Sequence, residues 1–165
     1  MSELVDDLDL KSSGCLHPCG FESRSRHFFM KIYFAGSITG GRDDQPLYEK
    51  IITMLGEYGE VLTQHVGDKK ISGLGENTGD NFIYNRDMGW LLASDIVVAE
   101  VTTPSLGVGY ELAIAEQKNK KILCLYRPID NRKLSALING NPKLTTKHYQ
   151  KIQDLTGIFD NFIKN

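Results

Sequence analysis

The sequence predicts a three-layer α/β domain built on a parallel sheet of about five strands. Short apolar runs alternate along the chain with segments that repeat apolar residues at helical spacing. The run 95–102 is almost continuously β-branched, which is typical of a central parallel strand covered on both faces. Because neighbouring parallel strands are joined by helical crossovers, this alternation indicates right-handed βαβ units.

Four elements are expected in the first half of the domain. The apolar run 31–35 ends in glycines, as a buried strand leading into a loop does. Apolar residues recur at helical spacing over 47–58, and glycines punctuate the end of that segment. The run 60–66 is strand-like and is followed by a glycine-bearing loop over 67–80. A capping residue at position 80 or 81 then opens a helix that runs to about residue 94.

The second half continues the alternation. The β-branched strand is followed by a helix over 107–119 and by a buried strand at 121–126. A short helix is expected around 135–138 and a weak strand near 145–149. The segment 154–163 has the apolar spacing of a closing helix.

Size and charge exclude several classes of protein. The chain has 165 residues, of which 41% are hydrophobic, and a formal net charge of −2. That length suits one domain with a buried core. The sequence contains nothing near the roughly 18 consecutive apolar residues of a membrane span, and its charge balance offers no broad basic field for duplex nucleic acid. We therefore expect neither a membrane nor a nucleic acid as partner.

The first 29 residues differ from the rest. They mix serine, glycine and proline with five acidic and three basic side chains, and so carry the whole net charge. We expect 1–29 to be a disordered tail and 30–165 to be the domain, with Met30 as an alternative start. Cys15, His17 and Cys19 resemble metal ligands, but a structural zinc needs four ligands, so no metal site is expected. Three cysteines form no disulfide framework, which favours the cytoplasm, with the nucleus as a second location.

Two loops at the carboxyl ends of predicted strands could bind an anion. Ligands of such sheets bind at that edge. Small residues over 36–41 let backbone N–H groups approach an anion, and Ser37 adds a hydroxyl. The glycine spacing matches neither G-x-G-x-x-G nor G-x-x-x-x-G-K-S/T, the two glycine-rich phosphate-binding motifs. A tight strand-to-helix turn without a ligand therefore remains an alternative interpretation. Ser105, in the loop 102–109, lies at a helix N-terminus, and the two loops together could hold one phosphate.

Two carboxylates are candidate catalytic groups. Glu111 lies in the early turns of the helix that follows the second loop, where the helix dipole favours an ionised carboxylate suited to attack on an anomeric carbon. The pattern alone favours the simpler interpretation, an ordinary glutamate that complements the dipole. Asp87 falls on the apolar stripe of the helix 81–94, where burial is costly unless the carboxylate is hydrogen-bonded or functional. The alternative is an edge position paired with solvent or with Arg86.

His65 and Tyr33 are further candidates. His65 ends its predicted strand, and Tyr33 lies inside the first strand. A strand-end histidine is more often structural, and a strand tyrosine is more often part of the core.

Five segments together resemble a known family, the 2′-deoxynucleoside 5′-monophosphate N-hydrolases, which are relatives of the nucleoside 2-deoxyribosyltransferases. The similarity spans about residues 31–165, and the stretch from Pro104 to Leu112 is the most specific part. The other matching segments are 32–42, 61–66, 98–102 and 122–128.

The resemblance implies a fold, an activity and a set of roles. The fold is flavodoxin-like with strand order 2-1-3-4-5, and the chain is a homodimer whose sites are shared. The activity is cleavage of the N-glycosidic bond of a deoxynucleoside monophosphate through an ester on Glu111, with no metal or organic cofactor. Asp87 is the acid-base group, Tyr33 orients the nucleophile, and His65 is catalytic or faces the base. The implied phosphate site comprises Gly36, Ser37, Ile38, Thr39, Gly40, Arg42, Ser105 and Gly107, with Ser135 from the neighbouring subunit.

One position departs from the family pattern, and three other functions stay open. Thr39 stands where mammalian relatives carry an arginine, so either phosphate affinity is lower or Arg42 compensates. The alternatives are a transferase that exchanges bases between deoxyribonucleosides, a hydrolase of ribonucleotides such as CMP, and a nucleotide sensor without activity.

Overall fold

The computed structural model describes residues 30–38, 44–68, 78–129 and 133–165. Its centre is a sheet of five strands in the order β2-β1-β3-β4-β5, and every neighbouring pair is parallel. The strands are β1 (Lys31–Ala35), β2 (Glu60–Val61), β3 (Ile96–Glu100), β4 (Lys121–Tyr126) and β5 (Thr145–His148). The predicted fold class and strand order are confirmed.

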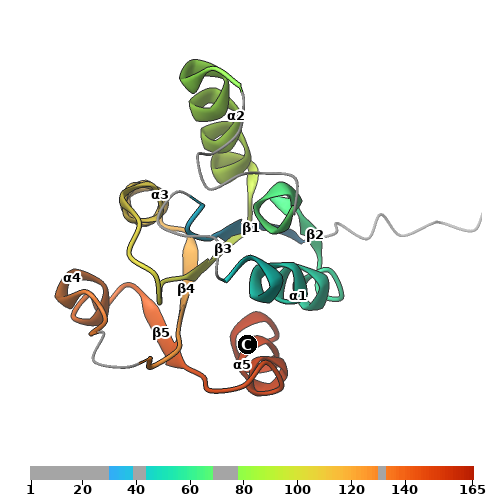
Figure 1. Ribbon diagram of the computed structural model, residues 1–165, viewed down its shortest axis with the longest axis vertical. Coiled ribbons are helices and arrows are strands. Elements are labelled where there is room, and N and C mark those ends of the chain that lie inside the picture. The colour runs from blue at the N-terminus through green and yellow to red at the C-terminus, as the bar shows by residue number, and fades with distance from the viewer. Residues whose placement is uncertain (1–29, 39–43, 69–77, 130–132) are drawn as a thin grey trace, which may run out of the picture.

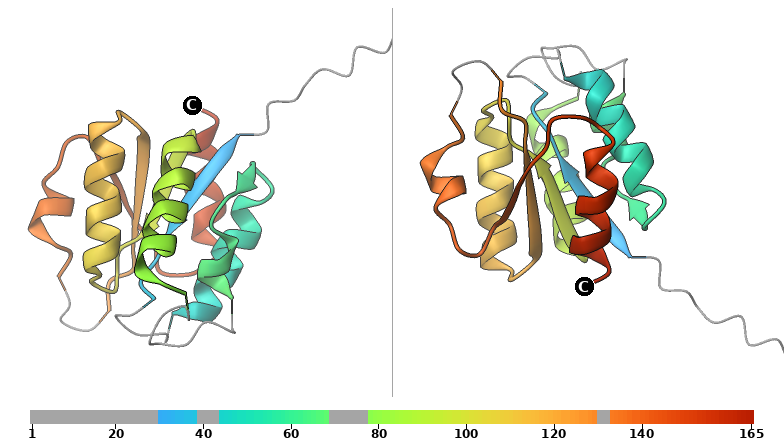
Figure 2. Two further views of the ribbon diagram at one scale, coloured as in Figure 1. Left: turned by 90° about the horizontal axis from the view of Figure 1, so that it is seen from above. Right: turned by 90° about the horizontal axis from the view of Figure 1, so that it is seen from below.

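Helices cover both faces of the sheet (Figures 1 and 2). On one face, α1 (Gln45–Leu55) and α5 (Asp154–Ile163) pack on a core that includes Phe34 and Val98. On the other face, α2 (Asp80–Ala93) and α3 (Leu106–Gln117) pack on a core that includes Tyr33 and Ala99. The short helix α4 (Ala136–Asn139) lies beside α3 at the β5 edge (Figure 1). Because side chains alternate along a strand, successive residues of β1 and β3 face opposite layers.

The predicted strand over 60–66 is wrong beyond Val61. The chain leaves the sheet there and forms a 3₁₀ turn, η1 (Gln64–Gly67). The hydroxyl of Thr63 explains the change, because it accepts a hydrogen bond from the Phe34 N–H at 2.8 Å and donates to the Phe34 carbonyl at 2.7 Å. This one side chain occupies both backbone groups of Phe34 that a longer β2 would use. The turn then packs on α1, where the Gln45 side chain donates to the Gly67 carbonyl.

The other elements differ from the prediction by a few residues at their ends. The predicted helix over 47–58 begins at Gln45, with Pro46 in its first turn, and ends at Leu55. After α3 the chain turns at Asn119, whose φ of 53° lies in the left-handed region that asparagine tolerates.

Several sequence expectations fall partly or wholly outside the described residues. The tail, including Cys15, His17 and Cys19, is among them. Within the described ranges, Cys124 is a buried free thiol, no group of His, Cys, Asp or Glu side chains is arranged to hold a metal ion, and no helix is long and apolar enough to cross a membrane.

Candidate active site

A tyrosine and a glutamate from two layers meet beneath the carboxyl edge of the sheet. Tyr33 is 2% exposed on β1 and its side chain faces α3. Its hydroxyl donates a hydrogen bond of 2.9 Å to Oε1 of Glu111, on the second turn of α3. Burial raises the pKa of the Tyr33 hydroxyl above its ordinary value, so the phenol stays protonated and keeps donating. The contact fixes one oxygen of the carboxylate.

Burial dominates the protonation of Glu111. It raises the pKa of this carboxyl to about 7, the Tyr33 hydrogen bond acts to lower it, and the charge of Asp87 adds to the rise. Burial thus outweighs the helix dipole, which favours the ionised form, since Glu111 lies beyond the first turn, where the dipole acts most strongly. At neutral pH the carboxyl is divided between its protonated and ionised forms.

Replacing Tyr33 with phenylalanine is expected to raise the pKa of Glu111 by about one unit. A hydrogen bond to a charged group contributes about 1.5 kcal/mol or more, and Phe removes the bond that favours the ionised form. Titration of the glutamate side-chain carbon resonances by NMR measures the shift directly. A matched Tyr84→Phe variant on exposed α2 should leave the Glu111 titration in place. An unchanged or lower pKa in Tyr33→Phe would show that the contact does not act on the carboxylate.

Asp87 lies on α2. The sequence suggested either burial on the apolar stripe of this helix or an edge position paired with Arg86, and the structure combines the two. Asp87 pairs with Nε of Arg86 at 2.9 Å, and its side chain is 17% exposed. Burial is the main cause of the raised pKa values of Glu111 and Tyr33, and the charge of Asp87 adds to both. The helix face it shares includes Leu91, which is fully buried. Asp87 is therefore a partly buried carboxylate that pairs with a cation and whose charge acts on Tyr33 and Glu111.

Arg86 connects Asp87 to His65. Its Nη2 lies 3.1 Å from Nε2 of His65, which the turn η1 presents. A guanidinium can only donate, so Nε2 accepts and the proton of the neutral imidazole resides on Nδ1. The guanidinium also stacks on Trp90, 5.0 Å from the ring centroid, and the His65 ring lies 5.3 Å from the same ring.

Sequence reasoning treated Arg86 only as a possible partner of Asp87 and missed its role as a bridge. A signal was present, because aromatic residues stand four positions before and after it, at Phe82 and Trp90. Residues with that spacing share one helix face, where their rings can sandwich a cation.

The loop after β1 begins in a crowded environment. A Cβ on Gly36 would lie 3.0 Å from the ring of Tyr48, so only glycine fits without displacing that ring. Ser37 is fully buried and Ile38 is partly buried. Thr39, Gly40 and Arg42 lie outside the described residues.

The loop after β3 delivers Ser105 to the start of α3. Ser105 is the N-cap residue, and its hydroxyl oxygen accepts from the Val108 N–H at 3.4 Å. Acceptance of that bond leaves the hydroxyl proton to be donated to an anion. Gly107, in the first helical turn, is exposed. The N-terminus of α3 thus has the geometry expected for one half of the phosphate site.

Ser135 lies across a groove from Ser105. A cavity of about 620 Å³ runs between α3 and α4, and both serines line it. Leu106 and Leu137 also line it, and they are 96% and 85% exposed. The structure therefore brings Tyr33 and Glu111 together, with Asp87 and Arg86 on the neighbouring helix and His65 in contact with Arg86. Ser135 lies on a mostly apolar groove that it shares with Ser105.

Comparison with known proteins places the chain in a family. The model of the family described as nucleoside 2-deoxyribosyltransferase matches residues 32–155. The chain belongs to the nucleoside 2-deoxyribosyltransferase family. Its relatives within that group include a 5-hydroxymethyl-dUMP N-hydrolase of Esox lucius, which is 48% identical over 140 residues, covering 82% of this chain and 97% of the relative.

Two further matches frame the family assignment. A putative 2′-deoxynucleoside 5′-phosphate N-hydrolase of Nematostella vectensis is 51% identical over 137 residues, covering 80% of this chain and 92% of the relative. The solved structure of the CMP N-glycosidase BcmB from Clostridium botulinum aligns with a TM-score of 0.58 at 20% identity, covering 80% of this chain and 98% of that one. At that identity the likeness shows a common fold. The family resemblance seen in the sequence is confirmed.

Proposed function

We propose that this member of the family hydrolyses the N-glycosidic bond of 2′-deoxynucleoside 5′-monophosphates, releasing the free base and 2-deoxyribose 5-phosphate. The observation that carries the proposal is the contact between Tyr33 and the partly buried carboxyl of Glu111, on the same helix that Ser105 caps. The names of the relatives, which are N-hydrolases of deoxynucleoside monophosphates, support this choice of reaction.

The helix α3 sets the spacing between phosphate and nucleophile. Glu111 follows Ser105 by six residues, which is about 9 Å along a helix axis at about 1.5 Å per residue. A 5′-phosphate at the helix N-terminus therefore leaves its sugar beside the carboxylate. Binding energy from the phosphate, remote from the bond that breaks, then holds the anomeric carbon C1′ in place.

In the first step the ionised Glu111 forms a bond to C1′ as the bond from C1′ to the base nitrogen breaks. The transition state resembles an oxocarbenium ion, which a 2′-deoxy sugar favours because it lacks the electron-withdrawing 2′-hydroxyl. In the second step water attacks the ester, giving 2-deoxyribose 5-phosphate and restoring the carboxylate. Tyr33 holds one carboxylate oxygen so that the other is directed at the sugar.

We assign the proton for the departing base to Asp87 in preference to His65. Nε2 of His65 accepts from Arg86, so this nitrogen presents no proton, and the proton on Nδ1 is that of a neutral imidazole, which is a much weaker acid than a carboxyl. Glu111, with a pKa of about 7, carries a proton in part of the population next to Asp87. Transfer of that proton to Asp87 makes Glu111 a nucleophile and Asp87 an acid at once, as neighbouring carboxylates that share a proton allow.

Incubation with a panel of nucleotides tests the proposed function. Deoxynucleoside monophosphates should yield free base and 2-deoxyribose 5-phosphate in equal amounts, and CMP should be cleaved much more slowly. The family description makes base exchange the second candidate, so a second free base is added in parallel. A swapped nucleoside would indicate a transferase, and saturable binding with no base release would indicate a sensor.

Replacing Ser105 with glycine is expected to raise KM for a deoxynucleoside monophosphate about tenfold or more, with a small change in kcat. Loss of one hydrogen bond to a charged phosphate accounts for this magnitude, while glycine at the N-cap costs the helix only a few tenths of a kcal/mol. The matched control is the deoxynucleoside without its phosphate, for which variant and parent should have equal kcat/KM. An equal loss with both substrates would place Ser105 outside the phosphate site.

We further propose that the chain forms a homodimer in which Ser135 reaches the neighbouring site. The groove between α3 and α4 and the exposed side chains of Leu106 and Leu137 form an apolar surface that a second copy would cover. Replacing Leu137 with glutamate should shift the protein from dimer to monomer in sedimentation velocity, whereas Thr156→Glu on α5 should not. A parent protein that sediments as a monomer at micromolar concentration would refute this proposal.

The cytoplasm, with the nucleus as a second site, stays our proposed location. Fluorescence microscopy of the tagged full chain tests it, and accumulation in a membrane-bound organelle would contradict it.

A further inference from the structure

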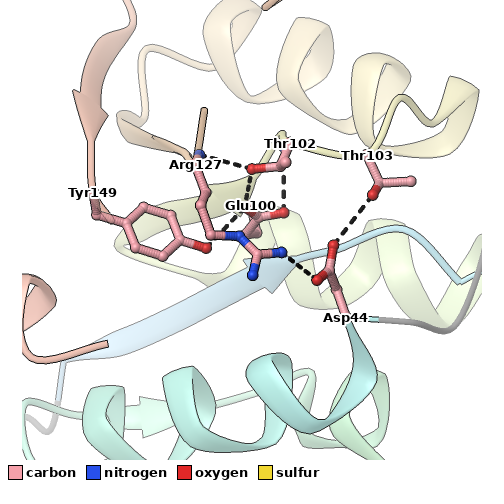
Figure 3. Close-up of polar contacts among 6 residues, drawn as sticks. All are labelled: Asp44, Glu100, Thr102, Thr103, Arg127 and Tyr149. Atoms are coloured by element: carbon pink, nitrogen blue, oxygen red, sulfur yellow. Dashed lines mark hydrogen bonds and ion pairs between the residues drawn. The ribbon is translucent and has the colours of Figure 1, made fainter. Parts of the chain in front are cut away.

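A polar network lies behind the two candidate phosphate loops, on the face of the sheet that α1 and α5 cover (Figure 3). At its centre is Glu100, the last residue of β3, which is fully buried. Its carboxylate accepts hydrogen bonds from the Thr102 hydroxyl, from the Thr102 N–H at 3.3 Å and from the Tyr149 hydroxyl at 3.0 Å. Three donors from two segments therefore converge on one buried carboxylate.

An ion pair extends the network to the start of α1. The Arg127 guanidinium, just past β4, pairs with the carboxylate of Asp44 (Figure 3). The backbone N–H of Arg127 donates to the Thr102 hydroxyl at 2.8 Å, and the Thr103 hydroxyl donates to Asp44 at 3.2 Å. Asp44 also caps α1, because its carbonyl accepts from the N–H groups of the first turn. These contacts thus connect the segment after β3, the end of β4 and the start of α1 to one another.

The network joins the two loops that we assign to the phosphate. Asp44 is where the loop after β1 enters α1, and Thr102 and Thr103 begin the loop that ends at Ser105. Tyr48, on α1, also borders both loops, because its ring lies 3.0 Å from the position of a Cβ on Gly36, and burial followed by the carboxylates of Glu100 and Asp44 raises the pKa of its hydroxyl. The placement of the loop after β3 relative to α1 therefore depends on these contacts.

The network does not touch the proposed reaction centre. Side chains alternate along β3, so Glu100 points with Val98 toward α1 and α5, whereas Tyr33 and Glu111 meet on the opposite face. A role in the chemical step is thus excluded by position. What remains is a role in placing the loops.

The charges make this arrangement hard to relax. Burial acts to lower the pKa of Arg127, but the Asp44 carboxylate outweighs it and raises the pKa, so the arginine stays charged. Burial raises the pKa of Glu100, while its hydroxyl and amide donors act in the opposite direction. A buried charge that loses its partner is costly, so removal of one member should displace the others.

We propose that Asp44, Glu100, Thr102, Thr103, Arg127 and Tyr149 form a positioning network that fixes the start of the loop after β3, which leads to Ser105, against the start of α1 at Asp44, and so helps to place the phosphate site. The inference rests on the proposed function, because it takes the substrate to carry a 5′-phosphate. These six residues would affect catalysis by positioning the phosphate loops, without contacting the sugar.

The main test separates binding from chemistry. Arg127→Gln should raise KM for a deoxynucleoside monophosphate about tenfold, by displacement of the phosphate loops, and change kcat by less than about twofold. Arg127→Lys should recover part of the loss. The double variant with Asp44→Asn should be no worse than the more affected single variant, because both act on one contact. A role in fold stability alone would lower the active fraction, and so kcat, without changing KM.

A second measurement does not depend on turnover or on a drastic substitution. Calorimetry with inorganic phosphate should show weaker binding to Arg127→Gln and, by a few-fold, to Thr103→Val, which removes one hydroxyl from a partly exposed side chain. Lys164→Gln, which breaks an exposed ion pair with Asp160, should bind phosphate as the parent does. Unchanged phosphate affinity in both network variants would overturn the inference, whereas a parent that binds phosphate but releases no base would overturn only the proposed function.

Discussion

Replacing Glu111 with glutamine is expected to lower the rate of base release by a factor on the order of 10³ to 10⁶, as the loss of a covalent nucleophile does in other enzymes. Glutamine has nearly the same shape and can still accept from the Tyr33 hydroxyl, so substrate binding should be retained. The rate is measured as free base released from a deoxynucleoside monophosphate. Glu57→Gln, the same change at an exposed turn, should leave the rate unaltered. A Glu111→Gln protein that turns over within tenfold of the parent would remove Glu111 from the mechanism.

The same variant should be more stable than the parent at pH 8. The pKa of Glu111 is about 7 in the folded protein against an ordinary 4.5, so between these values the folded state keeps a proton that the unfolded chain has lost. Stability therefore falls as pH rises through this window, by about 3 kcal/mol in total. Glutamine has no such charge to bury. Urea unfolding at pH 4.5 and pH 8 should show the parent losing stability relative to the variant only at the higher pH.

Replacing Asp87 with asparagine is expected to lower kcat/KM about 10²-fold to 10⁴-fold, the range for loss of a general acid. Asparagine cannot take up the proton that the departing base requires. Because the Asp87 charge acts to raise the pKa of Glu111, its removal should also lower that pKa. In the parent, loss of the proton that the two carboxyls share, with a pKa of about 7, sets the descending limb of the pH–rate profile. In the variant this limb should disappear, and the residual rate should rise as Glu111 ionises.

Loss of the descending limb separates an acid from a structural residue. Asp80→Asn, at the exposed start of the same helix, should leave both rate and profile unchanged. A slow Asp87→Asn enzyme that keeps the descending limb of the parent would mean that Asp87 does not supply the proton.

The arrangement of layers and strands could be predicted from sequence, because apolar periodicity records which faces are buried. The end of β2 could not be predicted. The Thr63 hydroxyl forms the two hydrogen bonds to the Phe34 backbone that a longer β2 would form, and apolar periodicity does not reveal that a side chain will replace backbone groups in this way. Val61 and Val66 of the run 60–66 are buried, as in a strand, but the chain between them forms a 3₁₀ turn that packs on α1.

The residues of the candidate site could be predicted from sequence, but their protonation states and long-range ion pairs could not. Tyr33 and Glu111 do touch, while their catalytic roles stay predictions. The pKa of Glu111 depends on how deeply α3 packs, which a helix position does not reveal. The Arg127–Asp44 pair joins residues 83 positions apart, and Glu100 looked like one more residue of a buried strand. Contacts between residues so far apart in sequence can be identified only in the folded structure, where the sheet brings them together.

The most direct test of the account is a crystal structure of the Glu111→Gln protein with an intact deoxynucleoside monophosphate. We expect the phosphate between Ser37 and Ser105, and the side chain of residue 111 within about 3.5 Å of C1′, the separation of a near-attack geometry. A nucleotide whose phosphate lies away from both loops, or a residue 111 side chain directed away from the sugar, would contradict it.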